Sequence, residues 1–368
     1  MDITFTHHTS LALLRAARWD NDLELHATGA MSCPTERIQG EALDNVLDAI
    51  TPLIGEPSSD SPCWTVRSSR QGGSCDARIV EHLRSGVFPE GSYLEIRPKP
   101  NGGEAAHLTS GARVLIEGPA LALVSYASFL SGLVRTGAME EWLAVDNVIA
   151  LGDELCGSFA RDATNPMGGD CAFGLAPVAG RDEIAELLET MPRMSGLTLA
   201  RRAIGYVADG SASPMETLHR MMETLPPKLA GLSIGRPKMN HRIEPSPQQR
   251  KVLSIGDGMR PDLYWEEYGI AIEHDGERGH LTRRRWRSDH ERIQDYQVCG
   301  IKVFPATFED VATVERLNAF AEKLCHAIAE AGNPGVGKRV RALIRNDRFR
   351  ARQRELLASL LPPVSDGE

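Results

Sequence analysis

Hydrophobic and polar positions alternate most regularly in the last third of the chain. Ser213 and Pro214 are typical of a helix start, because a serine side chain caps free N–H groups and proline needs no N–H in the first turn. The residues that follow predict a helix from 214 to 225, which Pro226 and Pro227 end. A helix therefore opens this part of the chain.

Short runs with a period of two follow this helix and predict strands. They cover residues 239–244, 259–265 and 269–275, and the last two are close enough in sequence to form a hairpin. Residues 281–299 have the spacing of a helix, 301–306 form a short apolar strand, and 308–331 carry an apolar stripe at helical spacing. The expected order is helix, three strands, helix, strand, helix.

The first two thirds of the chain are less regular. We expect helices at 10–19, 119–133, 181–191 and 198–208, and strands at 93–98 and 112–118. A length of 368 residues fits two or three domains. The predicted fold class is α/β in the broad sense: a mixed α+β domain at 1–140, a helical bridge at 141–212, an αβββαβ domain at 213–332, and a basic helix and tail at 333–368.

The composition is that of an ordinary soluble globular protein, with 42% hydrophobic and 25% charged residues. The amino terminus has no basic leader, and no stretch reaches the roughly 18 apolar residues of a membrane helix, so we expect a cytoplasmic protein without a membrane partner. Seven cysteines form no C-x-x-C pair, which argues against a zinc site.

Charge is distributed unevenly along the chain. The net charge of −9 argues against a protein that simply coats nucleic acid. Residues 338–354, however, hold eight basic side chains and one acid, so this segment carries about +7 and the remainder about −16. The carboxyl-terminal segment is therefore a candidate basic arm.

Acidic side chains gather on the expected hairpin. Alternation places Glu273 and Asp275 on one face of their strand. If Glu266 and Glu267 form a two-residue turn, Asp262 lies on the same face, one diagonal away from Glu273. A three-residue turn would move Asp262 to the opposite face. Converging carboxylates supply the hard oxygen ligands that Mg²⁺ needs in phosphodiester cleavage.

The region 213–329 resembles the PD-(D/E)XK superfamily, whose members have a restriction-endonuclease-like core, and within it the very-short-patch-repair-like endonuclease domains of actinobacterial proteins. The resemblance covers the helix opening SPMET, the strands MNHRI and RPDLYW, the segment E-x-D-G with a histidine after it, and D-x-x-R in the next helix. It implies that Asp262 and Glu273 bind the metal, that Glu216 is an acid recruited from the first helix, and that His280 lies near the scissile phosphate. Taken alone, Glu216 is more typical of an exposed acid on the helix surface.

The chain departs from the superfamily two positions after Glu273, where Asp275 replaces the usual lysine. Asp275 then serves either the site or a turn before Gly276. His280 is either a loop residue or an active-site base, and it or Arg278 could supply the missing positive group.

Four arginines in the next predicted helix are candidates for phosphate contacts with DNA, with a solvated helix face as the alternative: Arg283, Arg284, Arg285 and Arg287. Further along the same helix, Asp289 and Arg292 are spaced for an ion pair on the helix surface, which needs no functional role.

These features predict a Mg²⁺-dependent DNA endonuclease. The alternative is a nuclease-fold protein without catalytic activity that binds DNA or protein as a regulator. The amino-terminal region loosely resembles abortive-infection antitoxins, which suggests a protein partner for it.

Overall fold

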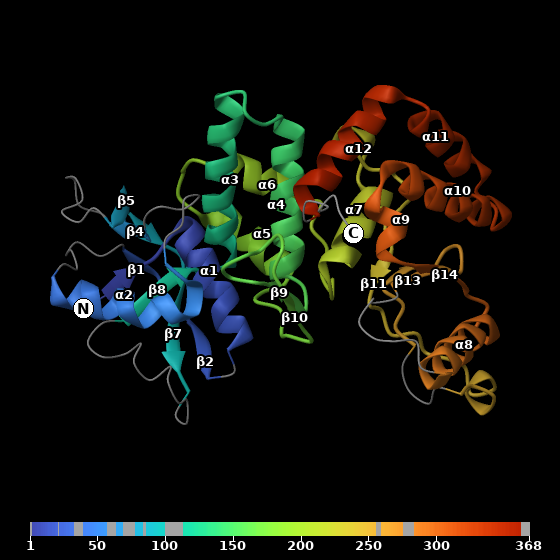
Figure 1. Cartoon of the computed structure of the whole chain (residues 1–368), viewed down its shortest axis with the longest axis horizontal. Coiled ribbons are helices and arrows are strands. Elements are labelled where there is room, and N and C mark those ends of the chain that lie inside the picture. Colours follow the sequence, from blue (N-terminus) through green and yellow to red (C-terminus); the bar gives the residue numbers. More distant parts are fainter. Residues whose placement is uncertain are drawn as a thin grey trace. The chain divides into compact units, whose positions relative to one another are not determined.

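The computed structural model divides the chain into two compact units, Met1–Val207 and Ala208–Glu368 (Figure 1). It describes residues 2–20, 22–32, 40–56, 64–68, 78–83, 86–99, 113–254, 259–274 and 283–361, without the side chains of 67, 68, 83 and 283–290. Both units combine helices with small sheets, so the protein is of the mixed α/β class. Within the described ranges, no helix is long and apolar enough to cross a membrane.

The first unit contains the helices α1 (His7–Trp19), α2 (Glu41–Ile54), α3 (Pro119–Arg135), α4 (Glu141–Leu155), α5 (Arg181–Thr190) and α6 (Leu197–Ile204). Its strands are β1 (Asp2–Thr4), β2 (Leu23–Ala27), β3 (Met31–Ser32), β4 (Trp64–Ser68), β5 (Ile79–Leu83), β6 (Val87–Phe88), β7 (Tyr93–Pro98), β8 (Arg113–Glu117), β9 (Phe159–Arg161) and β10 (Cys171–Phe173).

A four-stranded sheet in the order β1-β8-β7-β2 forms the centre of this unit. The strands expected at 93–98 and 112–118 are β7 and β8, which pair antiparallel. The helix expected at 119–133 is α3, which begins at Pro119 because proline suits the first helical turn. Helices α4, α5 and α6 pack with α3, so residues 141–207 belong to this unit.

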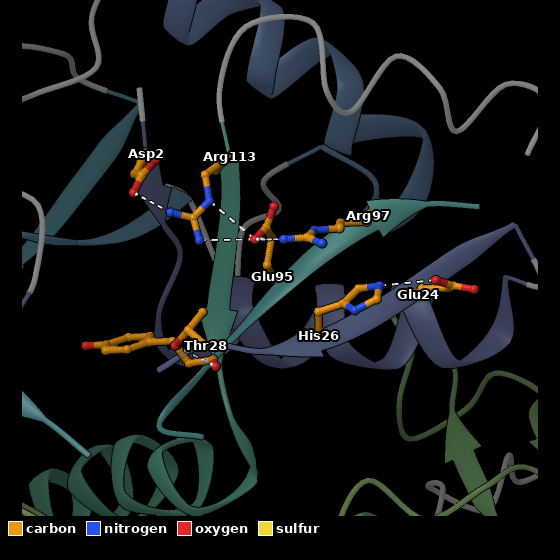
Figure 2. Close-up of polar contacts among 8 residues, drawn as sticks. Asp2, Glu24, His26, Thr28, Glu95, Arg97 and Arg113 are labelled. Atoms are coloured by element: carbon orange, nitrogen blue, oxygen red, sulfur yellow. Dashed lines mark hydrogen bonds and ion pairs between the residues drawn. The ribbon is translucent and has the colours of Figure 1, made fainter. Parts of the chain in front are cut away.

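A network of charged side chains crosses the sheet of the first unit. Glu95 on β7 accepts hydrogen bonds from Arg97 at 2.7 Å and from Arg113 on β8 at 3.1 Å (Figure 2). Arg113 also donates to Asp2 on β1. These two guanidinium groups lower the pKa of Glu95 to about 2. The network ties three strands together through their side chains.

The second unit contains α7 (Pro214–Thr224), β11 (Lys238–Met239), β12 (Leu263–Trp265), β13 (Ile270–His274), α8 (Arg283–Val298), β14 (Lys302–Ala306), α9 (Phe308–Ala312), α10 (Val314–Glu330), α11 (Pro334–Ile344) and α12 (Asp347–Leu360). Its strands form one sheet in the order β11-β12-β13-β14. The pairs β11 with β12 and β12 with β13 are antiparallel, whereas β13 and β14 are parallel.

The turn between β12 and β13 differs from the two-residue turn that we expected. Trp265 pairs with Ile270, so four residues, from Glu266 to Gly269, form the turn. Gly269, the last residue of the turn, adopts φ of +60°, a conformation that glycine takes without steric cost. Because the register shifts by two residues, each side chain keeps its face, and the partner of each residue changes.

The two faces of this sheet pack against different helices (Figure 1). Leu263, Trp265, Ile270 and Ile272 join a large apolar core with α10 and α11. On the other face, Ala271 packs with Tyr296 of α8 in a smaller core. By the same alternation, the side chain of Glu273 lies on the face that packs against α8, and the side chain of His274 lies on the face that packs against α7 and α10.

Two other elements are shorter than expected. The strand expected at 239–244 ends at Met239, because Asn240 adopts φ of +46° and leaves the extended conformation. The helix expected at 308–331 is interrupted at Thr313, whose side chain accepts a hydrogen bond from the backbone N–H of Arg316 and so caps α10. Thr313 thus bonds within its own segment, whereas the amide of Asn240 donates to distant partners, the carbonyl of Gly210 and the carboxyl of Glu216.

Candidate metal and phosphate site

The hairpin brings Asp262 close to Glu273. Leu263 pairs with Ile272 at the end of the ladder, so Asp262 precedes β12 by one residue and Glu273 follows Ile272 by one on the neighbouring strand. The Oδ2 atom of Asp262 accepts a hydrogen bond from the backbone N–H of His274 at 2.5 Å. The backbone carbonyl of Asp262 accepts from the N–H of Asn240 at 3.0 Å. Hydrogen bonds therefore fix both the side chain and the backbone of Asp262.

Helix α7 supplies a third carboxyl group. Ser213 caps this helix by accepting a hydrogen bond from the N–H of Glu216 at 3.1 Å. The buried carboxyl of Glu216 accepts from the amide of Asn240 at 2.6 Å and from the N–H of Ala212 at 2.9 Å. Burial, and next the charge of Asp262, raise the pKa of Glu216 to about 7. The carboxyls of Glu216 and Asp262 therefore act on each other electrostatically.

Glu273 is held by two side chains from one face of α8. Arg292 and Tyr296, four residues apart, donate hydrogen bonds to its two carboxylate oxygens. The Glu273 side chain is only 7% exposed. Burial and the neighbouring Glu273 carboxylate raise the pKa of Tyr296, which keeps its hydroxyl a hydrogen-bond donor. The ion partner of Arg292 is thus Glu273, whereas we expected Asp289, whose side chain lies outside the described residues.

A pair of histidines, His219 buried and His274 partly buried, lies on the other side of β13. His219 of α7 and His274 share a hydrogen bond of 2.6 Å between Nδ1 and Nε2, and the ring of His219 also contacts Phe320. Burial lowers the pKa of both rings, to about 4 for His274, although Asp310 opposes this shift. The sequence did not indicate this pair, because the two residues are 55 positions apart.

The remaining residues expected at the site lie outside the described part of the chain. Asp275 and His280 fall in the undescribed segment 275–282. The four arginines predicted to contact phosphate lie in α8, and the structure describes their backbone but not their side chains: Arg283, Arg284, Arg285 and Arg287.

The donor atoms of Glu216, Asp262 and Glu273 are carboxylate oxygens, the ligands that Mg²⁺ prefers. In the part of the chain that the structure describes, no group of three or more His, Cys, Asp or Glu side chains is assembled closely enough to hold a metal ion. Burial is the main reason why the pKa of Glu216 is raised, and the neighbouring charge of Asp262 adds to it, an effect that a bound divalent cation would oppose. The carboxylate groups of these residues are therefore suitable ligands for Mg²⁺, although that of Glu273 forms an ion pair with Arg292.

Comparisons of the chain with protein families, curated proteins and solved structures return no match.

Proposed function

We propose that this chain is a Mg²⁺-dependent DNA endonuclease of the PD-(D/E)XK type. The observation that carries the proposal is the position of Asp262 beside the strand that holds Glu273, where it accepts a hydrogen bond from the N–H of His274, with Glu216 beside Asp262. The order of elements supports it as well, because α7, three antiparallel strands, α8, β14 and α10 follow the αβββαβ pattern of the restriction-endonuclease-like core.

The chemistry follows from the residues of this site. Hydrolysis joins the oxygen of one water to phosphorus and breaks the bond to a sugar oxygen, which takes up a proton. Bound Mg²⁺ would acidify the attacking water and neutralise charge on the phosphate. Asp262 and Glu273 would hold the ion, and Glu216, whose pKa of about 7 lets it carry a proton near neutral pH, would sit beside the reacting water.

A second candidate function is a nuclease-fold protein that binds DNA or protein without cleaving DNA. One specific observation favours it: the carboxylate of Glu273 is paired with Arg292, whose positive charge repels a cation that approaches the same carboxylate. Asp275 in place of lysine points the same way. The two functions differ in turnover and share the DNA-binding surface.

Nicking of supercoiled plasmid with Mg²⁺ or Mn²⁺ separates these functions. We expect cleavage by the wild-type chain, loss of at least about a hundredfold in Asp262→Asn and Glu273→Gln, and little change in Glu267→Gln, an exposed acid of the same hairpin. Cleavage that persists in both site variants would eliminate the proposed site. Salt-sensitive DNA binding without cleavage would favour the regulator.

A further inference from the structure

Arg292 and Glu273 form an ion pair whose two members differ in exposure. The side chain of Glu273 is 7% exposed and that of Arg292 is 42% exposed, so the guanidinium reaches into the site from solvent. Among the described residues, Arg292 has no second carboxylate partner, since its one ion pair is with Glu273. The position of the guanidinium therefore depends on that single carboxylate.

A divalent cation and this guanidinium compete for the same carboxylate. Arg292 donates to Oε2 of Glu273, while the buried hydroxyl of Tyr296 takes Oε1. A carboxylate oxygen can accept a hydrogen bond and bind a metal ion at the same time, but a divalent cation and a guanidinium on the same carboxylate repel each other, so metal binding favours the departure of a positively charged donor. Tyr296 is 1% exposed and packs in the small core with Ala271 of β13, whereas Arg292 extends into solvent on a long side chain. Arg292 is therefore the donor that can leave.

A guanidinium released from Glu273 would carry its full charge at the mouth of the site. Its planar set of donors matches the oxygens of a phosphate group, to which arginine binds through two parallel hydrogen bonds. The nearest such group in a nuclease complex is the phosphodiester held beside the metal. Release from the carboxylate and capture by the phosphate would thus use the same side chain.

We propose that Arg292 is a phosphodiester-binding residue that also acts as the counter-ion of Glu273 when no metal is bound. This inference rests on the proposed function. It couples the two ligands of the site, because metal binding frees Arg292 for DNA, and DNA that holds Arg292 frees Glu273 for metal. By linkage, each ligand then raises the affinity for the other by the same factor.

The test measures metal and DNA binding separately on the full chain. Mn²⁺ binding is followed by calorimetry for the wild type, Arg292→Gln, Arg292→Lys and Arg316→Gln, a control in the same unit whose ion pair with Glu309 is exposed. We expect Arg292→Gln to bind Mn²⁺ several-fold more tightly than the wild type, because the competing cation is gone. Arg316→Gln is expected to bind Mn²⁺ like the wild type.

The same variants are then titrated with a fluorescent DNA duplex in Ca²⁺ over a series of salt concentrations. We expect Arg292→Gln to bind DNA several-fold more weakly, with a salt slope reduced by about one, and Arg292→Lys to restore most of the salt slope. General damage to the fold would weaken the binding of both Mn²⁺ and DNA. Tighter metal binding together with weaker DNA binding is therefore specific to the proposal.

Three outcomes would each overturn a different claim: the exchange by Arg292, its binding of phosphate, or the nuclease site itself. If Glu273→Gln abolishes Mn²⁺ binding and Arg292→Gln leaves it unchanged or weaker, the exchange by Arg292 is wrong and the metal site stands. If Arg292→Gln binds DNA with wild-type affinity and salt slope, Arg292 is not a phosphate ligand. If neither the wild type nor Arg292→Gln binds Mn²⁺ in a way that depends on Glu273, the proposed nuclease site fails too.

Discussion

The imidazole rings of His219 and His274 meet in the interior of the second unit, with Nδ1 of one 2.6 Å from Nε2 of the other. A single proton can lie between two nitrogens at this distance, so the pair holds together only when at least one ring is neutral. Burial favours the neutral form of both rings, and the second nitrogen of His219, Nε2, has no hydrogen-bond partner among the described residues. The pair should therefore make the second unit sensitive to acid.

We predict that acidification from pH 7 to pH 5 destabilises the protein through this pair. The pKa of His274 is lowered from 6.5 to about 4, so below pH 6.5 the unfolded chain takes up a proton that the folded chain refuses. The free energy of unfolding should fall by about 2 kcal/mol from His274 over this range. Denaturant unfolding of His274→Gln should show a smaller loss, whereas His326→Gln, an exposed histidine, should behave like the wild type.

A buried carboxyl group at Glu223 should have the opposite pH dependence. Its side chain is fully buried on α7, neither oxygen has a hydrogen-bond partner among the described residues, and burial raises its pKa to about 8. Between pH 4.5 and 8 the unfolded chain loses this proton while the folded chain keeps it, so the stability falls as the pH rises.

Glu223→Gln should therefore be more stable than the wild type at pH 8, by a few kcal/mol at about 1.4 kcal/mol per pKa unit, and close to it at pH 5. The matched control is Glu322→Gln on α10, where the side chain is exposed. Urea titrations at the two pH values make the comparison. An equal difference between Glu223→Gln and the wild type at both pH values would show that Glu223 is ionised in the folded chain.

The ion pairs of Glu95 in the first unit give a third prediction (Figure 2). Because Arg97 and Arg113 lower the pKa of Glu95 to about 2, their stabilisation is complete above pH 4.5 and is lost as the pH falls toward 2. Both arginines are about half exposed, so solvent screening limits the effect to about 1 kcal/mol. Glu95→Gln should lose this stabilisation at pH 6 and should differ little in stability from the wild type at pH 2.5, as measured by thermal unfolding.

High salt distinguishes this contribution from packing. In 1 M NaCl the difference between wild type and Glu95→Gln at pH 6 should shrink, because screening acts on the exposed guanidinium groups. Glu24→Gln serves as the control, since Glu24 is 43% exposed and its ion pair among the described residues is with His26. A difference that does not respond to salt would assign the effect of Glu95 to packing.

Local signals in the sequence were sufficient to predict most elements near the site. Ser213 and Pro214 predict the start of α7, and the alternation around Ile270 and Ile272 predicts β13 and its two faces. These features depend on neighbours within a few residues, which the sequence displays directly. The length of the turn before Gly269 was mispredicted, because glycine at its last position allows a four-residue turn as readily as a tight one.

The contacts that define the chemistry of the site could not be predicted in the same way. Arg292 meets Glu273 across 19 positions and His219 meets His274 across 55, and only the packing of helices on the sheet brings them together. The spacing of Arg292 from Asp289 favoured a pair within the helix, since the apolar spacing through Ile293 and Tyr296 indicates a buried face of α8 but not which charged neighbour of that face reaches the sheet. Asn240 shows a weaker signal, because asparagine tolerates the positive φ that aims its amide at Glu216.

The central claim is that Asp262 and Glu273 together hold the metal ion of a nuclease site. The most direct measurement is the anomalous diffraction signal of Mn²⁺ in crystals of the full chain soaked with the ion. We predict one peak within about 2.3 Å of a carboxylate oxygen of each residue, with Arg292 turned away from Glu273. Saturating Mn²⁺ that leaves both carboxylates without a peak, and Arg292 still bonded to Glu273, would contradict the claim.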